Sequence, residues 1–192
     1  HWMKRKAAER NCAIAGSVAV CENGNYYNRF YFVHPDGAVQ HYDKKHLFTF
    51  GGEHKRFTAG TERVVVNFRG VRILLEVCYD LRFPVWARNL GDYDMILYVA
   101  SWPTPRVDAW SALLRVRAIE NQCYVAGVNR MGVDPACEYS GGSAIIDPYG
   151  KTIAECPWSR ESAVSADIDM EALQTFRKKF PVLDDADPFT LI

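Results

Sequence analysis

The amino-acid sequence predicts one α/β domain in which helices pack on β-sheets. Strand-like apolar segments alternate with helix-like segments, and several neighbouring strands are joined by hairpin-type turns. The 192 residues are enough to bury one hydrophobic core. No internal repeat, low-complexity segment or linker divides the chain, so we expect a single domain over residues 1–192.

The N-terminal third predicts a helix followed by three strands. The composition of residues 1–10 favours a helix, and an apolar strand begins directly afterwards, over 12–20. This order is typical of the second half of a strand–helix–strand unit, so we expect the first half to be missing from the chain. Strands over 28–34 and 38–42 flank the turn Pro35-Asp36-Gly37, and residues 43–60 lack clear periodicity and predict a loop.

The remaining residues alternate between strands and helices. The turn Arg69-Gly70 joins strands over 63–68 and 71–78, and Pro84 suits the first turn of a helix over 83–90. The later segments predict, in order, a strand over 95–100, a helix over 107–121, strands over 123–129, 142–147, 151–156 and 164–168, and a helix over 170–180. For the tail, residues 182–192, we expect an ordered arm, a contact between subunits or a frayed end.

Composition argues against two classes of partner. Lys plus Arg and Asp plus Glu both number 23, so the formal net charge is zero and the chain has no basic surplus to neutralise phosphates. The longest apolar runs, over 14–20 and 95–100, are far shorter than the roughly 18 residues that a membrane-spanning helix needs. Neither nucleic acid nor a membrane is therefore expected as a partner.

The six cysteines predict a reducing, cytoplasmic compartment. They are scattered along the chain, and several, such as Cys12 and Cys123, lie in strand-like apolar segments where a free cysteine behaves as a small hydrophobic residue. No CxxC pair occurs, so we expect no zinc or other metal site.

Cys78 is the strongest candidate for a catalytic side chain. It ends an apolar strand, and a tight turn and a helix follow it. A helix N-terminus and a nearby cation lower the pKa of a thiol, and the thiolate is the nucleophilic form. The backbone N–H of Tyr79 would then help to hold an oxyanion. On the residues alone, Cys78 could equally be one more cysteine of the core.

Lys44 is the second candidate, in the segment Tyr42-Asp43-Lys44-Lys45-His46-Leu47-Phe48. A lysine drawn into a partly apolar site can stabilise an anionic intermediate or transfer protons. Glu53 follows it by nine positions and could orient its ammonium group. A solvated pair of surface lysines is the alternative.

Together these segments resemble the nitrilase, or carbon–nitrogen hydrolase, superfamily. Residues 42–48 match the motif of the family's catalytic lysine, and residues 77–84 match its nucleophile motif. Glu53 lies where many members carry a supporting glutamate. Segments 94–106 and 117–122 are also similar, so the resemblance covers essentially the whole chain. It is greatest to the omega-amidase branch, which hydrolyses terminal amides of 2-oxo acids.

The resemblance implies a four-layer α-β-β-α sandwich of the nitrilase type, in which two domains commonly pack together, so a homodimer or larger homo-oligomer is expected. It also implies amide hydrolysis through a thioester on Cys78, with Lys44, Glu53 and Tyr79 as supporting groups and no cofactor. The substrate would be a small-molecule amide, and Trp102 would form a wall of its pocket or belong to the core.

One member of the family's triad has no match. The general-base glutamate belongs to a segment before the point where this chain begins, and we expect it upstream of residue 1. Glu9 and Glu22 lack the surrounding motif and are not assigned this role. For Glu76, two residues before Cys78, we expect a paired or structural role.

The other polar residues near these motifs have less specific roles. We expect Asp80 and Arg82 to pair with each other or with the backbone, and His46 and His54 to pack near the loop. Arg106 and Arg130 are candidates for binding a substrate carboxylate or for solvated positions. Two alternative functions remain at this point: a thiol protease or transferase that pairs Cys78 with a histidine, and a non-enzymatic domain retained for assembly.

Overall fold

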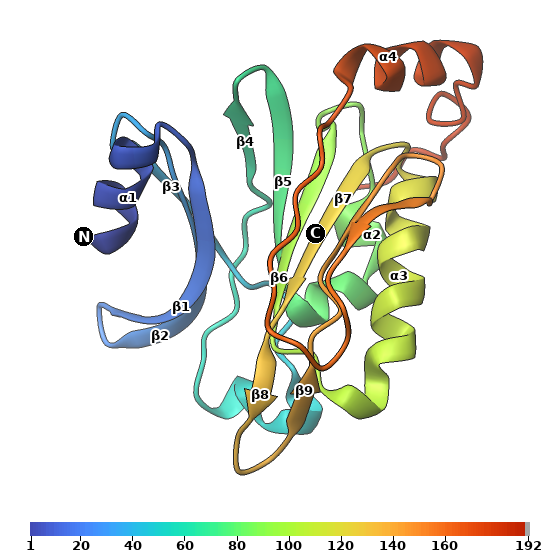
Figure 1. Ribbon diagram of the computed structural model, residues 1–192. Coiled ribbons are helices and arrows are strands. Elements are labelled where there is room, and N and C mark those ends of the chain that lie inside the picture. Colours follow the sequence, from blue (N-terminus) through green and yellow to red (C-terminus); the bar gives the residue numbers. More distant parts are fainter. Residues whose placement is uncertain (191–192) are drawn as a thin grey trace.

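The computed structural model describes residues 1–190. Two β-sheets face each other and are enclosed by helices on their outer sides (Figure 1). The smaller sheet has the order β1-β2-β3, and the larger has the order β11-β10-β7-β6-β5-β4. The layer order is therefore helix, sheet, sheet, helix, as the resemblance implied.

The smaller sheet is an antiparallel meander of β1 (Ile14–Glu22), β2 (Asn25–Val33) and β3 (Val39–Asp43). Asn23 and Gly24 both have positive φ in the turn between β1 and β2, as the commonest two-residue hairpin turns require. Helix α1 (Trp2–Arg10) packs on the outer side of this sheet, where Ala7 is fully buried. This packing gives the N-terminal helix its tertiary support.

The larger sheet has parallel strands at its centre and antiparallel strands at its edges. Its strands are β4 (Val65–Phe68), β5 (Val71–Val77), β6 (Met95–Ala100), β7 (Tyr124–Asn129), β10 (Ala144–Ile146) and β11 (Thr152–Glu155). Helices α2 (Pro84–Ala87) and α3 (Val107–Glu120) follow β5 and β6 and cover the outer face. Because β5, β6 and β7 are parallel, the residues after their carboxyl ends gather at one edge.

Apolar side chains fill two layers. Between the sheets, the large side chains are Phe30, Phe32 and Tyr42 from the smaller sheet and Leu75 and Val77 from β5. Between the larger sheet and its helices, a second cluster contains, among others, Leu74, Tyr98, Trp110, Leu114 and Val125. Alternation along β5 thus sends successive side chains into different layers.

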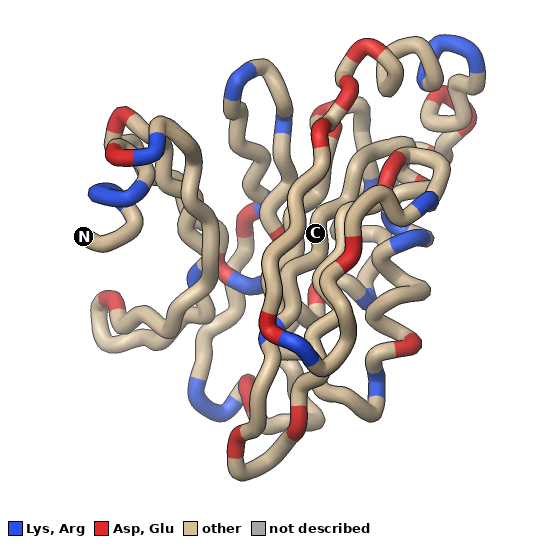
Figure 2. Tube along the Cα trace, in the orientation of Figure 1, with Lys and Arg blue, Asp and Glu red and all other residues tan. Residues whose placement is uncertain are grey.

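The C-terminal part adds short elements. Strands β8 (Met131–Val133) and β9 (Glu138–Ser140) form a hairpin, and Asp169 caps helix α4 (Met170–Lys179) through the Ala172 N–H. The described residues also include the 3-10 turns η1 (Thr49–Gly51), η2 (Glu53–Lys55), η3 (Cys78–Arg82) and η4 (Thr104–Arg106). Positive and negative side chains are intermixed along the chain (Figure 2). No helix in residues 1–190 is long and apolar enough to cross a membrane.

Several expected elements differ from the structure. Residues 164–168 do not form a strand: residues 161–165 are exposed, and residues 164–168 are not paired with any strand of the described sheets. The helix expected over 83–90 spans only Pro84–Ala87, since Asn89 instead bonds to Asn121 and Tyr93. The hairpin β8–β9 was not expected. The tail prediction concerns residues 182–192, of which 191 and 192 lie outside the described residues.

Candidate active site

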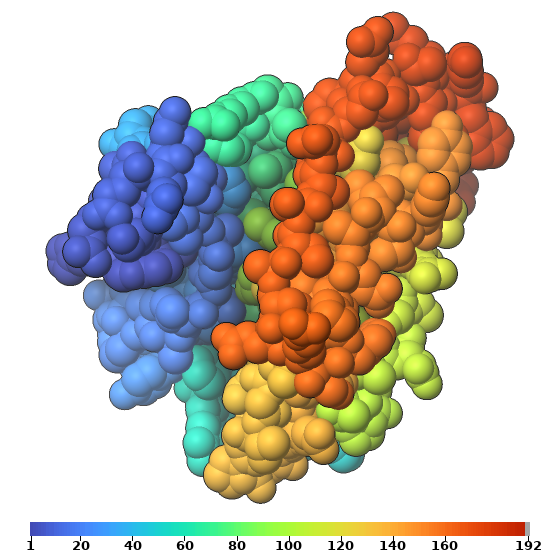
Figure 3. Space-filling model, viewed as in Figure 1, coloured from blue at the N-terminus to red at the C-terminus, as the bar shows by residue number. Residues whose placement is uncertain are grey.

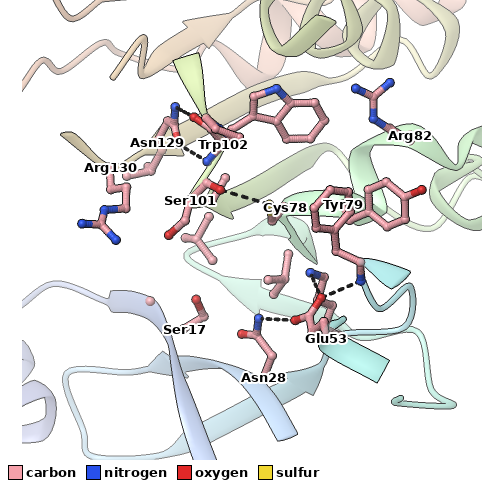
Figure 4. A pocket seen from close by; sticks show the side chains of 18 of the residues that line it. Ser17, Asn28, Glu53, Cys78, Tyr79, Arg82, Ser101, Trp102, Asn129 and Arg130 are labelled. Atoms are coloured by element: carbon pink, nitrogen blue, oxygen red, sulfur yellow. Dashed lines mark hydrogen bonds and ion pairs between the residues drawn. The ribbon is translucent and has the colours of Figure 1, made fainter. Parts of the chain in front are cut away.

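Cys78 borders a cavity of about 530 Å³ between the two sheets. It follows β5 and opens η3 with φ of 50°, a left-handed conformation that is uncommon and strained for a residue other than glycine. Its Sγ lies 3.9 Å from the Ser101 carbonyl oxygen, which follows β6 (Figure 4). The surface in Figure 3 is hollowed between β1 and the orange segment that follows β11. The thiol is thus presented to a space large enough for a small molecule.

Asp80 fixes the turn that carries Cys78, which we call the elbow (residues 77–82). Its buried carboxylate accepts hydrogen bonds from the backbone N–H groups of Val77 and His46, from His46 Nδ1 and from the Tyr42 hydroxyl, at 2.8 to 3.0 Å. These bonds join the elbow to β3 and to the segment after it. Four donors satisfy the carboxylate, which allows it to be buried without a pairing arginine.

Arg82 does not pair with Asp80, so that part of the expectation is wrong. Its guanidinium instead lies 5.0 Å from the centre of the Trp102 ring and borders the cavity. The other part of the expectation, that Asp80 bonds to the backbone, is confirmed by the contacts to Val77 and His46.

Lys44 and Glu53 form an ion pair at the same cavity. Lys44 is 3% exposed, and its Nζ lies 2.7 Å from Glu53 Oε2. Glu53 also accepts hydrogen bonds from the Phe48 backbone N–H at 2.6 Å and from Asn28 Nδ2 at 3.1 Å. The adjacent Lys45 turns away and lies over the Trp86 ring, 5.2 Å from its centre. Of these two adjacent lysines, Lys44 borders the cavity and Lys45 does not.

The pKa values of Glu53 and Cys78 shift in opposite directions. Burial alone would raise the pKa of Glu53, but the charge of Lys44 and three hydrogen bonds hold it below its ordinary value. Burial raises the pKa of the Cys78 thiol, and the charge of Lys44 offsets this only in part. The lowered thiol pKa expected from the sequence is not found, because desolvation outweighs the nearby cation.

Trp102 belongs both to the cavity wall and to the core. It is 2% exposed, and its indole N–H donates to the Arg106 carbonyl oxygen at 2.7 Å. Asn129, at the end of β7, accepts from the Trp102 N–H at 2.7 Å and donates to the carbonyl oxygens of Trp102 and Gly141. The loops after β6 and β9 are thereby held at fixed positions around Cys78.

Several residues that border the cavity were not singled out by the sequence, among them Asn28, Ser101 and Asn129. Asn28 on β2 positions Glu53, Ser101 contacts the thiol, and Asn129 joins two loops. Ser101 and Asn129 directly follow or end parallel strands, a position that often carries site residues and gave a usable signal. Asn28 lay within an ordinary strand pattern and gave none.

The other candidates divide into residues that border the cavity and residues that do not. His46 stacks on Phe83 with ring centres 3.8 Å apart, and neither His46 nor His54 borders the cavity. Tyr79 and the guanidinium-bearing residues Arg106 and Arg130 do border it. Within residues 1–190, no three His, Cys, Asp or Glu side chains are grouped to hold a metal ion.

Comparison with known proteins identifies the family of this chain. The sequence matches the profile described as carbon–nitrogen hydrolase over residues 1–178. The chain belongs to the carbon–nitrogen hydrolase family. Among its relatives in this family, it is 52% identical to omega-amidase YafV of Escherichia coli K12, over the whole chain and 75% of that protein. It is 40% identical to 2-oxoglutaramate amidase of Bacillus subtilis 168, over 96% of the chain and 72% of that protein.

Solved structures of carbon–nitrogen hydrolases have the same fold. The crystal structure of XC1258 from Xanthomonas campestris, a CN-hydrolase superfamily protein with an arsenic adduct in its active site, matches with a TM-score of 0.96 and 46% identity. The match covers the whole chain and 75% of XC1258. The nitrilase-type fold predicted from the two motifs is thus confirmed.

Proposed function

We propose that this carbon–nitrogen hydrolase is an amidase that hydrolyses the terminal amide of a 2-oxo dicarboxylic acid monoamide. The observation that carries the proposal is the meeting of Cys78 with the Lys44–Glu53 ion pair at one cavity. Relatives that are 40% to 52% identical over nearly the whole chain are named omega-amidase or 2-oxoglutaramate amidase, which supports the substrate class.

The reaction proceeds by acyl transfer through a thioester. The Cys78 thiol gives its proton to a base, and its sulfur bonds to the amide carbon. The Lys44 ammonium and the N–H of Tyr79 stabilise the oxyanion that forms; each such donor is typically worth about 3 kcal/mol of barrier. Collapse breaks the C–N bond, and ammonia leaves with the proton. Water then attacks the thioester, releasing the acid and restoring the thiol.

Glu53 is not proposed as the base that accepts the thiol proton. Glu53 is the only carboxylate among the described residues that border the cavity, and it is held as an anion by Lys44, Phe48 and Asn28. Its low pKa makes it a weak acceptor for the thiol proton. Glu53 therefore orients Lys44 and is not the proposed base.

Positive side chains around the cavity suit an anionic substrate. Arg82, Arg106 and Arg130 border it, and Figure 4 shows Arg82 and Arg130 on opposite sides of Cys78. Aromatic rings hold the three guanidinium groups in place, at 4.3 to 5.5 Å from the ring centres of Trp102, Phe48 and Tyr139. An amide that also carries a carboxylate would gain from this charge, whereas a simple aliphatic amide would not.

The direct test is ammonia release from 2-oxoglutaramate by the protein and by Cys78→Ala. We expect release from the native protein and none above background from the variant. Cys123→Ala is a matched control, because Cys123 is fully buried away from the cavity. Equal turnover of a simple nitrile, or full activity of Cys78→Ala, would contradict the proposal.

The alternative of a thiol protease finds no support at the cavity, because no histidine of residues 1–190 borders it. The alternative of a domain retained only for assembly predicts no ammonia release under any condition, so the same assay separates it. We also keep a homodimer or larger homo-oligomer as a proposal, tested by light scattering. A cytoplasmic location is supported by the six unpaired cysteines.

A further inference from the structure

Glu76 lies on β5 two residues before Cys78, and its side chain is fully buried. It shares its face of β5 with Leu74, which packs in the layer beneath the helices, and it does not border the cavity. Neither carboxyl oxygen has a hydrogen-bond partner within residues 1–190, so the paired role expected from the sequence is wrong. A buried carboxyl group without partners is costly, and its presence requires an explanation.

Two further residues, Tyr98 and Arg117, also have a buried polar atom without a hydrogen-bond partner among the described residues. Tyr98 on β6 lies directly opposite Glu76 in the parallel register, is fully buried, and its hydroxyl has no partner among the described residues. Arg117 on α3 donates from Nη1 to Glu120 at 2.7 Å and from Nη2 to the Leu81 carbonyl oxygen at 2.6 Å. Its Nε–H has no partner in the described residues. The charge of Arg117 opposes the rise in pKa of both Glu76 and Tyr98.

The surroundings of Glu76 favour its neutral form. Burial raises its pKa well above the ordinary value, the Asp80 carboxylate raises it further, and the guanidinium groups of Arg63 and Arg117 oppose the shift. Both opposing cations bond elsewhere: Arg63 to Asp92 and to backbone carbonyls, and Arg117 to Glu120 and Leu81. The remaining titratable groups that sense the charge of Glu76 are the phenols of Tyr42, Tyr93 and Tyr98.

We propose that Glu76 is a protonated carboxylic acid which, together with the Tyr98 hydroxyl and Arg117 Nε–H, binds ordered internal water behind the elbow. A neutral carboxylic acid has one donor and several acceptor sites, a phenol has both, and the guanidinium adds a donor. Buried water typically makes about three hydrogen bonds to such otherwise unpaired groups. The water would join β5, β6 and α3, and Arg117 extends the network to Leu81 of the elbow.

Glu76 is thus a positioning residue for Cys78. This role rests on the proposal that Cys78 is the nucleophile. The network supports the strained backbone of Cys78 from the side opposite the cavity. A neutral Glu76 also adds no negative charge beside the forming thiolate, where the Asp80 carboxylate is already present. An ionised Glu76 would oppose formation of the nucleophile.

Infrared spectroscopy tests the charge state without any activity assay. At neutral pH, native protein should show the carbonyl band of a protonated carboxylic acid, and Glu76→Gln should lack it. Glu53→Gln is the matched control: because Glu53 is an anion, its replacement should remove a carboxylate band and leave the acid band intact. Loss of a carboxylate band in Glu76→Gln, with no acid band in the native protein, would overturn the proposal.

A high-resolution crystal structure of the native protein tests the water and does not depend on the folding of a variant. We expect ordered water within hydrogen-bond distance of Glu76 and of Tyr98 or Arg117. Direct side-chain contacts with no water between these groups would overturn this part.

The pH dependence of Cys78 alkylation tests the link to the elbow. Glu76→Gln should leave the midpoint of the pH profile of alkylation unchanged, since the substitution replaces one neutral group by another. Removal of an anion would instead lower this midpoint.

Steady-state kinetics of a second variant test the same link. Tyr98→Phe should lower kcat about tenfold with KM unchanged, the effect of about 1.4 kcal/mol of lost positioning. A lowered midpoint in Glu76→Gln, or an unchanged kcat in Tyr98→Phe, would contradict the positioning role. Full activity of Cys78→Ala would instead refute the proposed function and leave the infrared result standing.

Discussion

At the scale of single residues, Cys78 must lose a proton that burial makes harder to remove. The charge of Lys44 favours the thiolate, and the carboxylates of Glu53 and Asp80 disfavour it. Desolvation is the largest of these effects, so the pKa of the thiol is raised above its ordinary value. Such an arrangement protects the sulfur from adventitious oxidation, because the thiolate is the reactive form.

The alkylation rate of Cys78 should therefore rise with pH through neutrality and beyond. Lys44→Met removes the one cation that lowers the thiol pKa, so its profile should move to higher pH. Iodoacetamide labelling followed by peptide mapping measures both profiles. A plateau already reached below neutral pH in the native protein would show that the thiol pKa is lowered and would contradict this assignment.

Lys44 and Lys45 differ in role although they are adjacent. Lys44→Met should lower kcat about 100- to 1,000-fold, the usual effect of losing one oxyanion donor. Lys45→Met should stay within a few-fold of native, because Lys45 lies over Trp86 and not at the cavity. Steady-state ammonia release measures both variants, and equal losses in the two would mean that the cation is not specific.

Ionisation of Glu53 should make the free energy of unfolding depend on pH. Its pKa in the folded protein is below the ordinary value, so its stabilising contribution is present above the ordinary carboxylate pKa and is lost as pH falls through the lower folded value. Urea unfolding at a series of acidic pH values should show this loss, and Glu53→Gln should flatten it. An identical pH dependence in the two proteins would exclude the linkage.

At the scale of elements, the elbow depends on Tyr42 of β3. Its buried hydroxyl donates to Asp80 and accepts from the Lys45 N–H and the Trp86 indole N–H. Tyr42→Phe should lower the free energy of unfolding by about 1–3 kcal/mol, because those groups lose a partner in the interior. Tyr26→Phe is the control, since Tyr26 is 55% exposed. Denaturant unfolding measures both, and equal stability of Tyr42→Phe and native protein would contradict the role.

Helix α3 packs on β7 through a glycine. A Cβ at Gly127 would lie 2.6 Å from Leu114 Cδ1 and 2.9 Å from Trp110 Cζ2, which is too close for either side chain. Gly127→Ala should therefore destabilise the fold by about 1–3 kcal/mol through overpacking. Gly16→Ala, on β1, meets no atom within 4 Å and should leave stability nearly unchanged. Thermal unfolding of the two variants separates these outcomes.

Most of these elements could be predicted because their sequence patterns act locally. The apolar runs of β5, β6 and β7 and the periodicity of α3 are visible along the chain, and the motifs around Cys78 and Lys44 are each contained in one short segment. What was missed depends on contacts between distant residues. Val164 and Ile168 suggested a strand, but a strand needs a neighbour to pair with. Three of the four hydrogen-bond donors to the Asp80 carboxylate come from β3 and from the segment after it, which no local pattern indicates.

At the scale of the whole molecule, the cavity exists because two sheets meet at the edge where the parallel strands end. The smaller sheet supplies Asn28 and, just after β3, Lys44, and the larger sheet supplies Cys78, Ser101 and Asn129. Neither sheet alone contains both the thiol and the cation. The site is therefore formed only when the layers pack, and its activity should be lost together with the packing of the two sheets.

In the proposed reaction, Cys78 carries the acyl group of the substrate. The protein is mixed with 2-oxoglutaramate, quenched in acid, and digested for peptide mass mapping. We predict that the peptide containing Cys78 gains the mass of the amide minus ammonia, and that Cys78→Ala neither forms this adduct nor releases ammonia. An acyl group on another residue, or undiminished ammonia release from Cys78→Ala, would contradict the account.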